Sequence, residues 1–183
     1  KKPGLAAIIV GNNTASKIYI DIKEKTCGEV GIYSERYNLP ETTKEQQLLQ
    51  LINKLNDANR IHAILVQMPL PNHIDEEKVI ASIKVEKDAD GFSSTNTGRL
   101  VSGNESKSMS IVPCTPKGII RLLEAYNVPI SGKKAVVVGR SKIVGKPTAL
   151  MLLNRNATVT ICHSKTRNIA EHTKNADILI AAA

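Results

Sequence analysis

The chain has 183 residues, with 25 basic and 17 acidic side chains and a formal net charge of +8. This length allows one domain or two small ones, and no apolar run approaches the roughly 20 residues that a membrane-spanning helix needs. Three scattered cysteines are too few for a disulfide framework or a metal knuckle, and a chain with no Trp and one Phe lacks the aromatic platforms that stack on nucleic-acid bases. We therefore expect neither a membrane nor a nucleic-acid partner, and no metal.

Strand and helix patterns alternate through the first half of the chain. In order, we expect a strand over 5–10, a helix over 15–30, a strand over 34–37, a helix over 43–56, a strand over 63–67 and a helix over 75–83. Thr42 or Thr43 is expected to cap the second of these helices. This alternation is typical of a parallel sheet that is covered by helices on both faces.

The stretch from Asp88 to Cys114 is rich in Gly, Ser, Asn and Thr and shows no sustained period, so it is predicted to be a linker or a site-forming loop. A helix is expected to follow, capped by Thr115 with Pro116 at its first helical position and ending near Tyr126. These features place a domain boundary near residue 113, which divides the chain into domains 1–112 and 113–183.

The second domain continues with alternating strands and helices. The expected elements are a strand over 135–139, a helix over 147–154, a strand over 158–162, a helix over 167–174 and a strand over 177–181. This is the first part of a doubly wound, Rossmann-type domain. Because the chain starts and stops abruptly at strand patterns, we expect it to be incomplete at both ends.

The first turn of this second domain resembles a dinucleotide-binding fingerprint without matching it. The run AVVVGRSKIVGKP from residue 135 has Gly139 in place, but Ser141 and a valine stand where G-x-G-x-x-G has its other glycines, and Gly145 comes one position late. Backbone N–H groups at a helix N-terminus still bind a pyrophosphate. Arg140 and Ser141 would add a positive charge and a hydroxyl group to this anion site.

The residues after the strand over 158–162 favour NADP over NAD. NAD-binding domains usually carry an acidic residue there, which binds the ribose 2′-hydroxyl. This chain has His-Ser-Lys-Thr-Arg over 163–167, with no carboxylate, so hydroxyls and two cations lie where a 2′-phosphate would bind. Alternatively, Lys165 and Arg167 only begin an exposed helix.

The first domain contains a second candidate site. Ser16, Tyr19 and Lys23 are spaced so that they share one face of the helix over 15–30. A partly desolvated lysine on such a face could relay a proton or activate a water. The alternative is an ordinary solvated lysine.

Two further polar residues lie where strands end. Gln67 closes the buried strand over 63–67, at the sheet edge where α/β proteins bind their ligands. Asp90 could accept two N–H bonds from an aminopyrimidine-like ring, or it could simply form a turn with the glycine that follows it.

Together these segments resemble the bifunctional methylenetetrahydrofolate dehydrogenase/methenyltetrahydrofolate cyclohydrolase family along nearly the whole chain. The segments that carry the resemblance are 3–11, 15–23, 64–71, 87–92, 96–100, 113–118, 136–147 and 162–166. The chain departs from the family pattern at Ser93-Ser94, where His-Pro is usual.

The resemblance implies NADP-dependent oxidation of 5,10-methylenetetrahydrofolate to the 5,10-methenyl form, then hydrolysis to 10-formyltetrahydrofolate. It also implies a cytoplasmic homodimer, with an organellar location left open, whose first domain is a three-layer α/β catalytic domain. The implied roles are a catalytic lysine at Lys23, a folate-flanking Tyr19, lysine partners at Ser16 and Gln67, a pterin anchor at Asp90, and cofactor ligands at Gly139, Arg140, Ser141 and Ser164.

The family's first helix would precede Lys1 and its glycine-rich segment would follow Ala183, so residues 1–183 alone are expected to be inactive. Two other functions remain open from the residues. One is a monofunctional NADP-dependent dehydrogenase of similar two-domain layout, such as the shikimate type. The other is a non-catalytic nucleotide- or nucleic-acid-binding module, suggested only by the net charge of +8.

Overall fold

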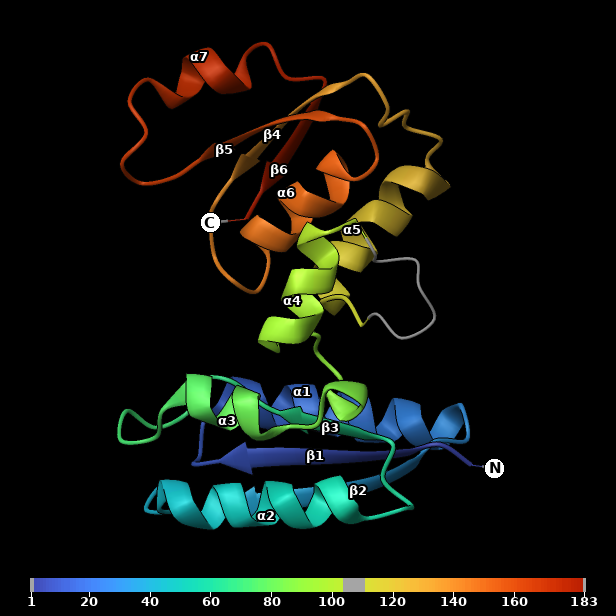
Figure 1. Ribbon diagram of the computed structural model, residues 1–183, viewed down its shortest axis with the longest axis vertical. Coiled ribbons are helices and arrows are strands. Elements are labelled where there is room, and N and C mark those ends of the chain that lie inside the picture. The colour runs from blue at the N-terminus through green and yellow to red at the C-terminus, as the bar shows by residue number, and fades with distance from the viewer. Residues whose placement is uncertain (1, 104–110, 183) are drawn as a thin grey trace. The chain divides into compact units, whose positions relative to one another are not determined.

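Each half of the chain builds its own parallel three-stranded sheet, as the alternation of strand and helix patterns predicts (Figure 1). The computed structural model describes residues 2–103 and 111–182. The chain divides into two compact units, Lys1–Ala89 and Asp90–Ala183. No helix in the described part of the chain is long and apolar enough to cross a membrane.

The sheet of the first unit has the strand order β2-β1-β3. Its strands are β1 (Gly4–Val10), β2 (Tyr33–Leu39) and β3 (Ala63–Val66). Both neighbours run parallel to β1, so all three strands end at the same edge of the sheet. Polar residues that follow these strands are therefore brought to one edge, where we expected Gln67 to lie.

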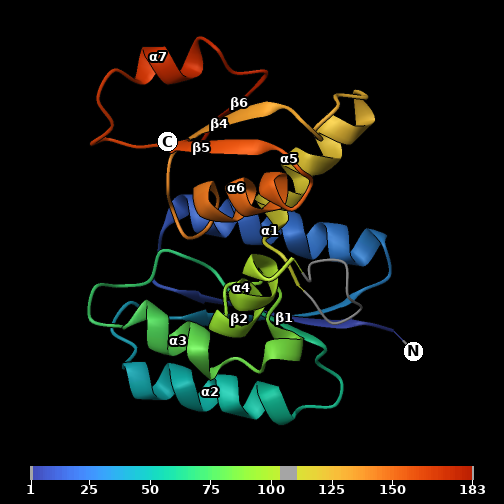
Figure 2. The same cartoon turned by 45° about the horizontal axis from the view of Figure 1, so that its top comes forward.

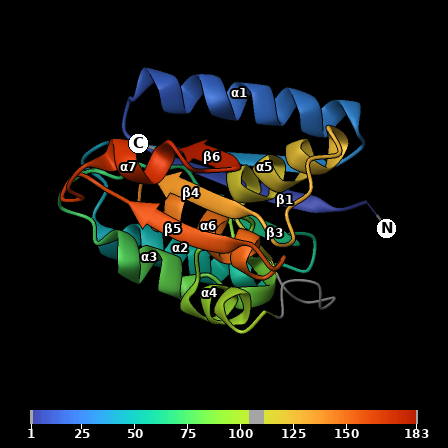
Figure 3. The same ribbon diagram turned by 90° about the horizontal axis from the view of Figure 1, so that it is seen from above.

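Helices cover both faces of this sheet because successive residues of β1 point to opposite sides. The helices are α1 (Thr14–Glu29), α2 (Glu45–Asp57) and α3 (Glu76–Ser82), followed by the short 3-10 turn η1 (Val85–Lys87). Ala6, Ile8 and Val10 share a core with α2 and α3, whereas Ala7 and Ile9 pack with Ile20 of α1. Figure 3 shows α1 on one side of the strands and α3 on the other. The expected three-layer α/β arrangement is confirmed.

The predicted cap of α2 was wrong. Lys44 is the N-cap residue, and the Gln47 side chain accepts a hydrogen bond from the Lys44 N–H at 3.0 Å. Thr43 is buried, and its hydroxyl donates to the Pro40 carbonyl at 2.6 Å. A bond within the preceding turn thus takes the side chain that was expected to cap the helix.

The second unit has the strand order β5-β4-β6, again with all strands parallel. Its strands are β4 (Lys134–Val138), β5 (Thr158–Cys162) and β6 (Ile178–Ala181), and its helices include α5 (Cys114–Ala125), α6 (Gly145–Leu153) and α7 (Ile169–Thr173). Figures 1 and 2 show α7 on the opposite face of this sheet from α5 and α6. The doubly wound arrangement is therefore confirmed.

Part of the stretch expected to be a linker or loop is a helix, α4 (Ser94–Val101). Ser93 caps it by accepting a hydrogen bond from the Asn96 N–H at 3.2 Å. Leu100 is buried in the core of the second unit, and its carbonyl accepts a bond from Asn154 Nδ2 at 2.9 Å. The polar composition of this segment gave no helix pattern in the sequence, although the helix is stabilised by its cap and by one buried leucine. Residues 104–110 of this stretch lie outside the described residues.

Because α4 packs into the second core, the compact units divide between Ala89 and Asp90 and not near residue 113. The division of functions into domains 1–112 and 113–183 stays a prediction.

The predicted start of α5 was two residues late, since the helix begins at Cys114 and not at Pro116, and its predicted cap was wrong. Pro113 is the N-cap residue, and its carbonyl accepts the first helical bond from the Lys117 N–H at 3.1 Å. Thr115 lies inside the first turn. Pro116 is tolerated there because the first N–H groups of a helix have no intrahelical partner.

Candidate functional site

Helix α1 places Lys23 on the stripe that faces the sheet of the first unit. Ser16, Ile20 and Cys27 of this stripe are buried, and Lys23 is half-buried between the last two. The helix starts at a fixed point because the Asn13 side chain accepts a hydrogen bond from the Ser16 N–H at 3.0 Å. The sequence analysis did not single out this cap.

Gln67 meets Lys23 at the edge where the strands of the first sheet end. Lys23 Nζ donates a hydrogen bond to Gln67 Oε1 at 3.3 Å. The Gln67 N–H donates to the Ile8 carbonyl at 2.9 Å, which holds Gln67 against the sheet directly after β3. Two residues that are 44 positions apart are thereby brought into contact by a helix and a strand end.

The Met68 carbonyl fixes the orientation of the Gln67 amide group. It accepts a hydrogen bond from Gln67 Nε2 at 2.9 Å and a long one from Ser16 Oγ at 3.5 Å. Since the amide NH₂ faces Met68, the amide oxygen is left to face Lys23. The sequence analysis missed this backbone atom, and the only signal for it was the Met68-Pro69 turn directly after a buried strand.

Tyr19 lies at the rim of this group. Its side chain is 60% exposed, and it makes no hydrogen bond to any residue in the described ranges. Ser16, Lys23 and Gln67 are therefore in contact around Met68, whereas Tyr19 shares only their helix face. An ammonium group has three hydrogens, and Gln67 accepts one of them. The arrangement can hold a proton donor in a fixed position beside a ligand.

Asp90 is the first residue of the second unit and is half-buried. The chain just before it is tied to the first sheet, where the Ala89 N–H donates to the Ile64 carbonyl at 3.2 Å and Asp88 is 2% exposed. The role of Asp90 as a pterin anchor stays a prediction.

In the second unit, two glycines shape the turn between β4 and α6. Gly139 has φ +129°, and a Cβ atom there would lie 2.1 Å from the Ala182 carbonyl oxygen. At Gly145, the first residue of α6, a Cβ atom would lie 2.3 Å from the Gly139 carbonyl oxygen. Gly145 thus allows the close helix–strand approach that the third glycine of the usual fingerprint provides, although it comes one position later.

The Ser141 side chain forms hydrogen bonds within this turn. Its hydroxyl oxygen accepts hydrogen bonds from the N–H groups of Val144 at 3.1 Å and Gly145 at 3.3 Å. A hydroxyl group that accepts two bonds can still donate its own hydrogen. Arg140 is exposed and forms no ion pair within the described ranges. The turn therefore combines a narrow backbone cradle with one hydroxyl and one exposed cation.

Ser164 follows the neighbouring strand at the same edge of the second sheet. The Gly139 N–H donates to the Cys162 carbonyl at 2.8 Å, which joins the ends of β4 and β5. Because β5 and β6 flank β4 on opposite sides, this edge contains a switch point, where doubly wound sheets bind their ligands. Ser164 is exposed beside it.

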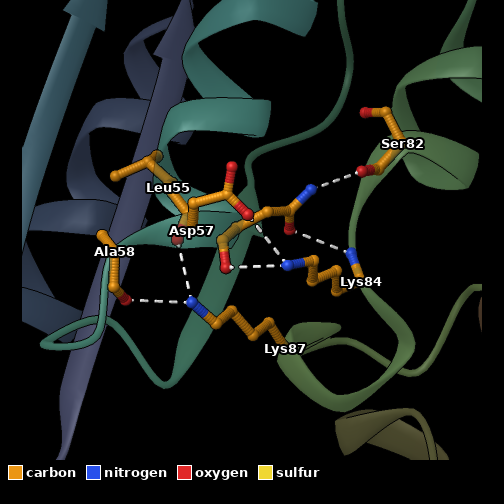
Figure 4. Close-up of polar contacts among 7 residues, drawn as sticks. Leu55, Asp57, Ala58, Ser82, Lys84 and Lys87 are labelled. Atoms are coloured by element: carbon orange, nitrogen blue, oxygen red, sulfur yellow. Dashed lines mark hydrogen bonds and ion pairs between the residues drawn. The ribbon is translucent and has the colours of Figure 1, made fainter.

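An open pocket of about 520 Å³, lined mostly by polar and charged residues, lies elsewhere in the first unit, where α2 ends and the chain approaches the start of β3. Figure 4 shows Lys87 there, with its Nζ donating to the Leu55 and Ala58 carbonyls at 3.0 Å each. Lys84 Nζ bonds Asp57 Oδ1 at 2.9 Å. Burial, with the nearby charge of Lys84, lowers the pKa of Lys87. These lysines bond the last carbonyl groups of a helix, which is a structural role.

Within residues 2–103 and 111–182, no group of three or more His, Cys, Asp or Glu side chains is arranged to hold a metal ion.

Comparisons with known proteins agree with the two-part layout. Residues 1–90 match the catalytic domain of tetrahydrofolate dehydrogenase/cyclohydrolase, and residues 113–183 match the NAD(P)-binding domain of the same enzyme. The bifunctional protein FolD of Nitrosospira multiformis is 55% identical over 182 residues, covering 100% of this chain and 62% of that protein. FolD of Moorella thermoacetica is 57% identical over 180 residues, covering 98% of this chain and 63% of that protein. The chain thus spans less than two thirds of the length of these relatives.

Solved structures show the same similarity. The bifunctional FolD enzyme of Campylobacter jejuni superposes with a TM-score of 0.96 at 47% identity, covering 100% of this chain and 64% of that chain. The Trypanosoma brucei enzyme, which was solved with NADP and an inhibitor, gives a TM-score of 0.95 at 38% identity, covering 100% of this chain and 62% of that chain.

The alternative of a shikimate-type dehydrogenase has support at the level of fold alone. Shikimate dehydrogenase from Aquifex aeolicus is 12% identical with a TM-score of 0.51, covering 99% of this chain and 63% of that chain. By contrast, both halves of the chain match domains of one folate enzyme, in the order in which the structure presents them. The chain belongs to the tetrahydrofolate dehydrogenase/cyclohydrolase family.

Proposed function

We propose that the protein is bifunctional. It oxidises 5,10-methylenetetrahydrofolate to 5,10-methenyltetrahydrofolate with NADP, and it then hydrolyses the product to 10-formyltetrahydrofolate. The observation that carries this proposal is the hydrogen bond between Lys23 Nζ and Gln67 Oε1 at 3.3 Å, in a chain of this family. A lysine held in this way suits hydrolysis, the step that needs a proton carrier.

In the hydrolytic step, water adds to the cationic methenyl carbon and loses a proton as the ring C–N bond opens. Lys23 is the group that we assign to this proton transfer. Gln67 holds the lysine nitrogen in place, and Gln67 is itself oriented by the Met68 carbonyl, which also accepts a hydrogen bond from Ser16. Exposed Tyr19 would lie against the folate and Asp90 would bind its pterin ring. By holding the lysine and the folate in fixed positions, these groups would lower the entropic cost of bringing the reacting groups together.

The second unit fits an NADP molecule because two glycines clear its first turn. A Cβ atom at either Gly139 or Gly145 would overlap backbone. When bound, NADP would supply the acceptor for the hydride that leaves the methylene carbon. The backbone at Gly139 would lie against the pyrophosphate, and Arg140, Ser141 and Ser164 would bind phosphate oxygens. The absence of a carboxylate over residues 163–167 favours a cofactor with a 2′-phosphate.

We also propose a cytoplasmic homodimer. All three cysteines are unpaired thiols, which suits a reducing compartment. Strand β5 is one of the two outer strands of its sheet within the described residues, and Ile161 on it is 41% exposed, so a second copy could pair with this edge. Sedimentation equilibrium of the complete protein tests the oligomeric state, and a monomer at micromolar concentration would contradict the dimer.

The test of function is the substitution Lys23→Met in the complete protein. It keeps most of the aliphatic side chain and removes the ammonium group. We expect hydrolysis of methenyltetrahydrofolate, followed by the loss of its absorbance, to slow by about 100-fold or more. NADP affinity, measured by titration calorimetry, should be unchanged because the cofactor residues lie in the other unit.

Lys25→Met is the matched control. Lys25 is on the same helix, and its side chain is 80% exposed beside Glu29. We expect this variant to hydrolyse methenyltetrahydrofolate at the wild-type rate. Normal hydrolysis by Lys23→Met would show that Lys23 is not the proton carrier.

A further inference from the structure

The segment that leaves β5 forms a closed turn from His163 to Thr166. The Thr166 N–H donates to the His163 carbonyl at 2.8 Å, and the His163 N–H donates to Thr166 Oγ1 at 2.8 Å. Two reciprocal bonds therefore join the ends of the turn. Its two central residues, Ser164 and Lys165, are exposed.

The imidazole ring of His163 adds a third bond inside this turn. Its Nδ1 accepts a hydrogen bond from the Lys165 N–H at 3.1 Å. A side chain that accepts from the N–H group two residues ahead does what Asn or Asp does in an Asx turn. In this arrangement the neutral ring carries its proton at Nε2.

The turn is anchored beside the cofactor turn of the second unit. Cys162, which precedes His163, accepts the hydrogen bond from the Gly139 N–H at 2.8 Å. The hydroxyl of Ser164 and the ammonium of Lys165 are thus presented next to the turn at Arg140, with no carboxylate between residues 163 and 167. A hydroxyl and two cations form a site of the right chemistry for a phosphate monoester.

We propose that His163 is a positioning residue for the 2′-phosphate of the cofactor, because its ring holds the turn in the shape that presents Ser164 and Lys165. This inference rests on the NADP preference proposed above and deepens it. Without the ring, the backbone around Lys165 is less ordered in the free protein. Binding of NADP then has to order this segment, which lowers the affinity. The pyrophosphate would bind at the turn between β4 and α6, so we expect the effect to fall on the 2′-phosphate.

The test compares NADP with NAD, which lacks the 2′-phosphate, in the complete protein. Dissociation constants of both cofactors are measured by titration calorimetry without folate. His163→Ala removes one hydrogen bond and should weaken NADP binding by about 3- to 10-fold, the range expected for a typical net hydrogen bond. NAD binding should change by less than about twofold. His163→Asn keeps an acceptor for the Lys165 N–H and should restore NADP binding to within about twofold of the wild type.

His172→Ala is the matched control, since it removes an exposed imidazole from α7 of the same unit. It should leave both dissociation constants unchanged. The proposal is overturned if His163→Ala binds NADP as tightly as the wild type, if it weakens both cofactors equally, or if His163→Asn fails to restore NADP binding.

Equal affinity of the wild type for NAD and NADP would also overturn the proposal. Tight NADP binding without reduction of NADP by methylenetetrahydrofolate would instead contradict the proposed folate chemistry and leave the result on His163 standing.

Discussion

The two units of the chain share a parallel, three-stranded α/β architecture but differ sharply in charge. Lys1–Ala89 carries 12 basic and 12 acidic side chains, whereas Asp90–Ala183 carries 13 and 5, so the whole formal charge of +8 belongs to the second unit. The first unit brings a few side chains together around one lysine. In the second unit, exposed cations lie around the glycine-containing turn between β4 and α6. A proton-transfer site needs one well-placed group, whereas an anionic cofactor needs room and a positive field.

The largest effect is expected from Gly145→Ala, which would break the backbone cradle of the second unit. Its Cβ atom would lie 2.3 Å from the Gly139 carbonyl oxygen, and backbone cannot move aside as a flexible side chain can. We expect a loss of about 1–3 kcal/mol of stability from overpacking and the loss of measurable NADP binding. Thermal unfolding and calorimetry measure the two effects.

Gly118→Ala is the control for this substitution. Gly118 lies inside α5, and a Cβ atom there would meet nothing within 4 Å. An alanine in a helix interior should leave stability equal or raise it by up to about 1 kcal/mol. If Gly145→Ala bound NADP like the wild type, the steric account of this turn would be wrong.

A smaller effect is expected from Gln67→Leu, which tests the side-chain cluster of the first unit. The substitution removes the acceptor that Lys23 faces, together with the hydrogen bond from the amide group to the Met68 carbonyl. Loss of one hydrogen bond to a charged group should slow hydrolysis of methenyltetrahydrofolate by about 10-fold. NADP affinity should not change.

Gln50→Leu, an exposed change on α2, serves as the control and should hydrolyse at the wild-type rate. Equal rates in the two variants would mean that Gln67 does not position Lys23.

The smallest effect is expected from salt, and it tests the charge difference itself. Raising the ionic strength from about 50 to 500 mM shortens the range of the field around the second unit. We expect the dissociation constant of NADP to rise several-fold, whereas kcat for hydrolysis at saturating methenyltetrahydrofolate should change by less than about twofold. In stopped-flow mixing, this loss of NADP affinity should appear mainly as a lower association rate constant. Equal salt sensitivity of both quantities would remove the functional meaning of the charge difference.

The elements of both sheets could be predicted from the sequence because buried strands and amphipathic helices have distinct local patterns. The order β5-β4-β6 could not, since it depends on contacts between distant residues. Helix α4 escaped prediction because its composition is polar. Two weak signals were present, Ser93 as a cap and Leu100 as a buried apolar residue.

For the candidate sites, spacing alone put Ser16, Tyr19 and Lys23 on one helix face. The role of Gly145 was harder to predict because the usual fingerprint requires glycines at fixed spacings, and Gly145 is one position away from the third of them. What the turn requires is a missing Cβ atom opposite the Gly139 carbonyl group, and this chain meets the requirement one residue later. The bond from Lys165 to the ring of His163 was hidden too, because histidine is not among the usual turn residues.

The carbonyl group of Met68 has a consequence for how this site can change over evolution. It orients Gln67 through a peptide oxygen that every amino acid possesses. A point substitution at residue 68 therefore alters the side chain without deleting the acceptor, and an alanine scan would pass over the atom that orients the amide. Substitutions that shift the path of the chain at this turn are the ones that would disturb it. Because of this contact, residue 68 should tolerate changes of side chain, whereas the chain beside it should not tolerate insertions or deletions.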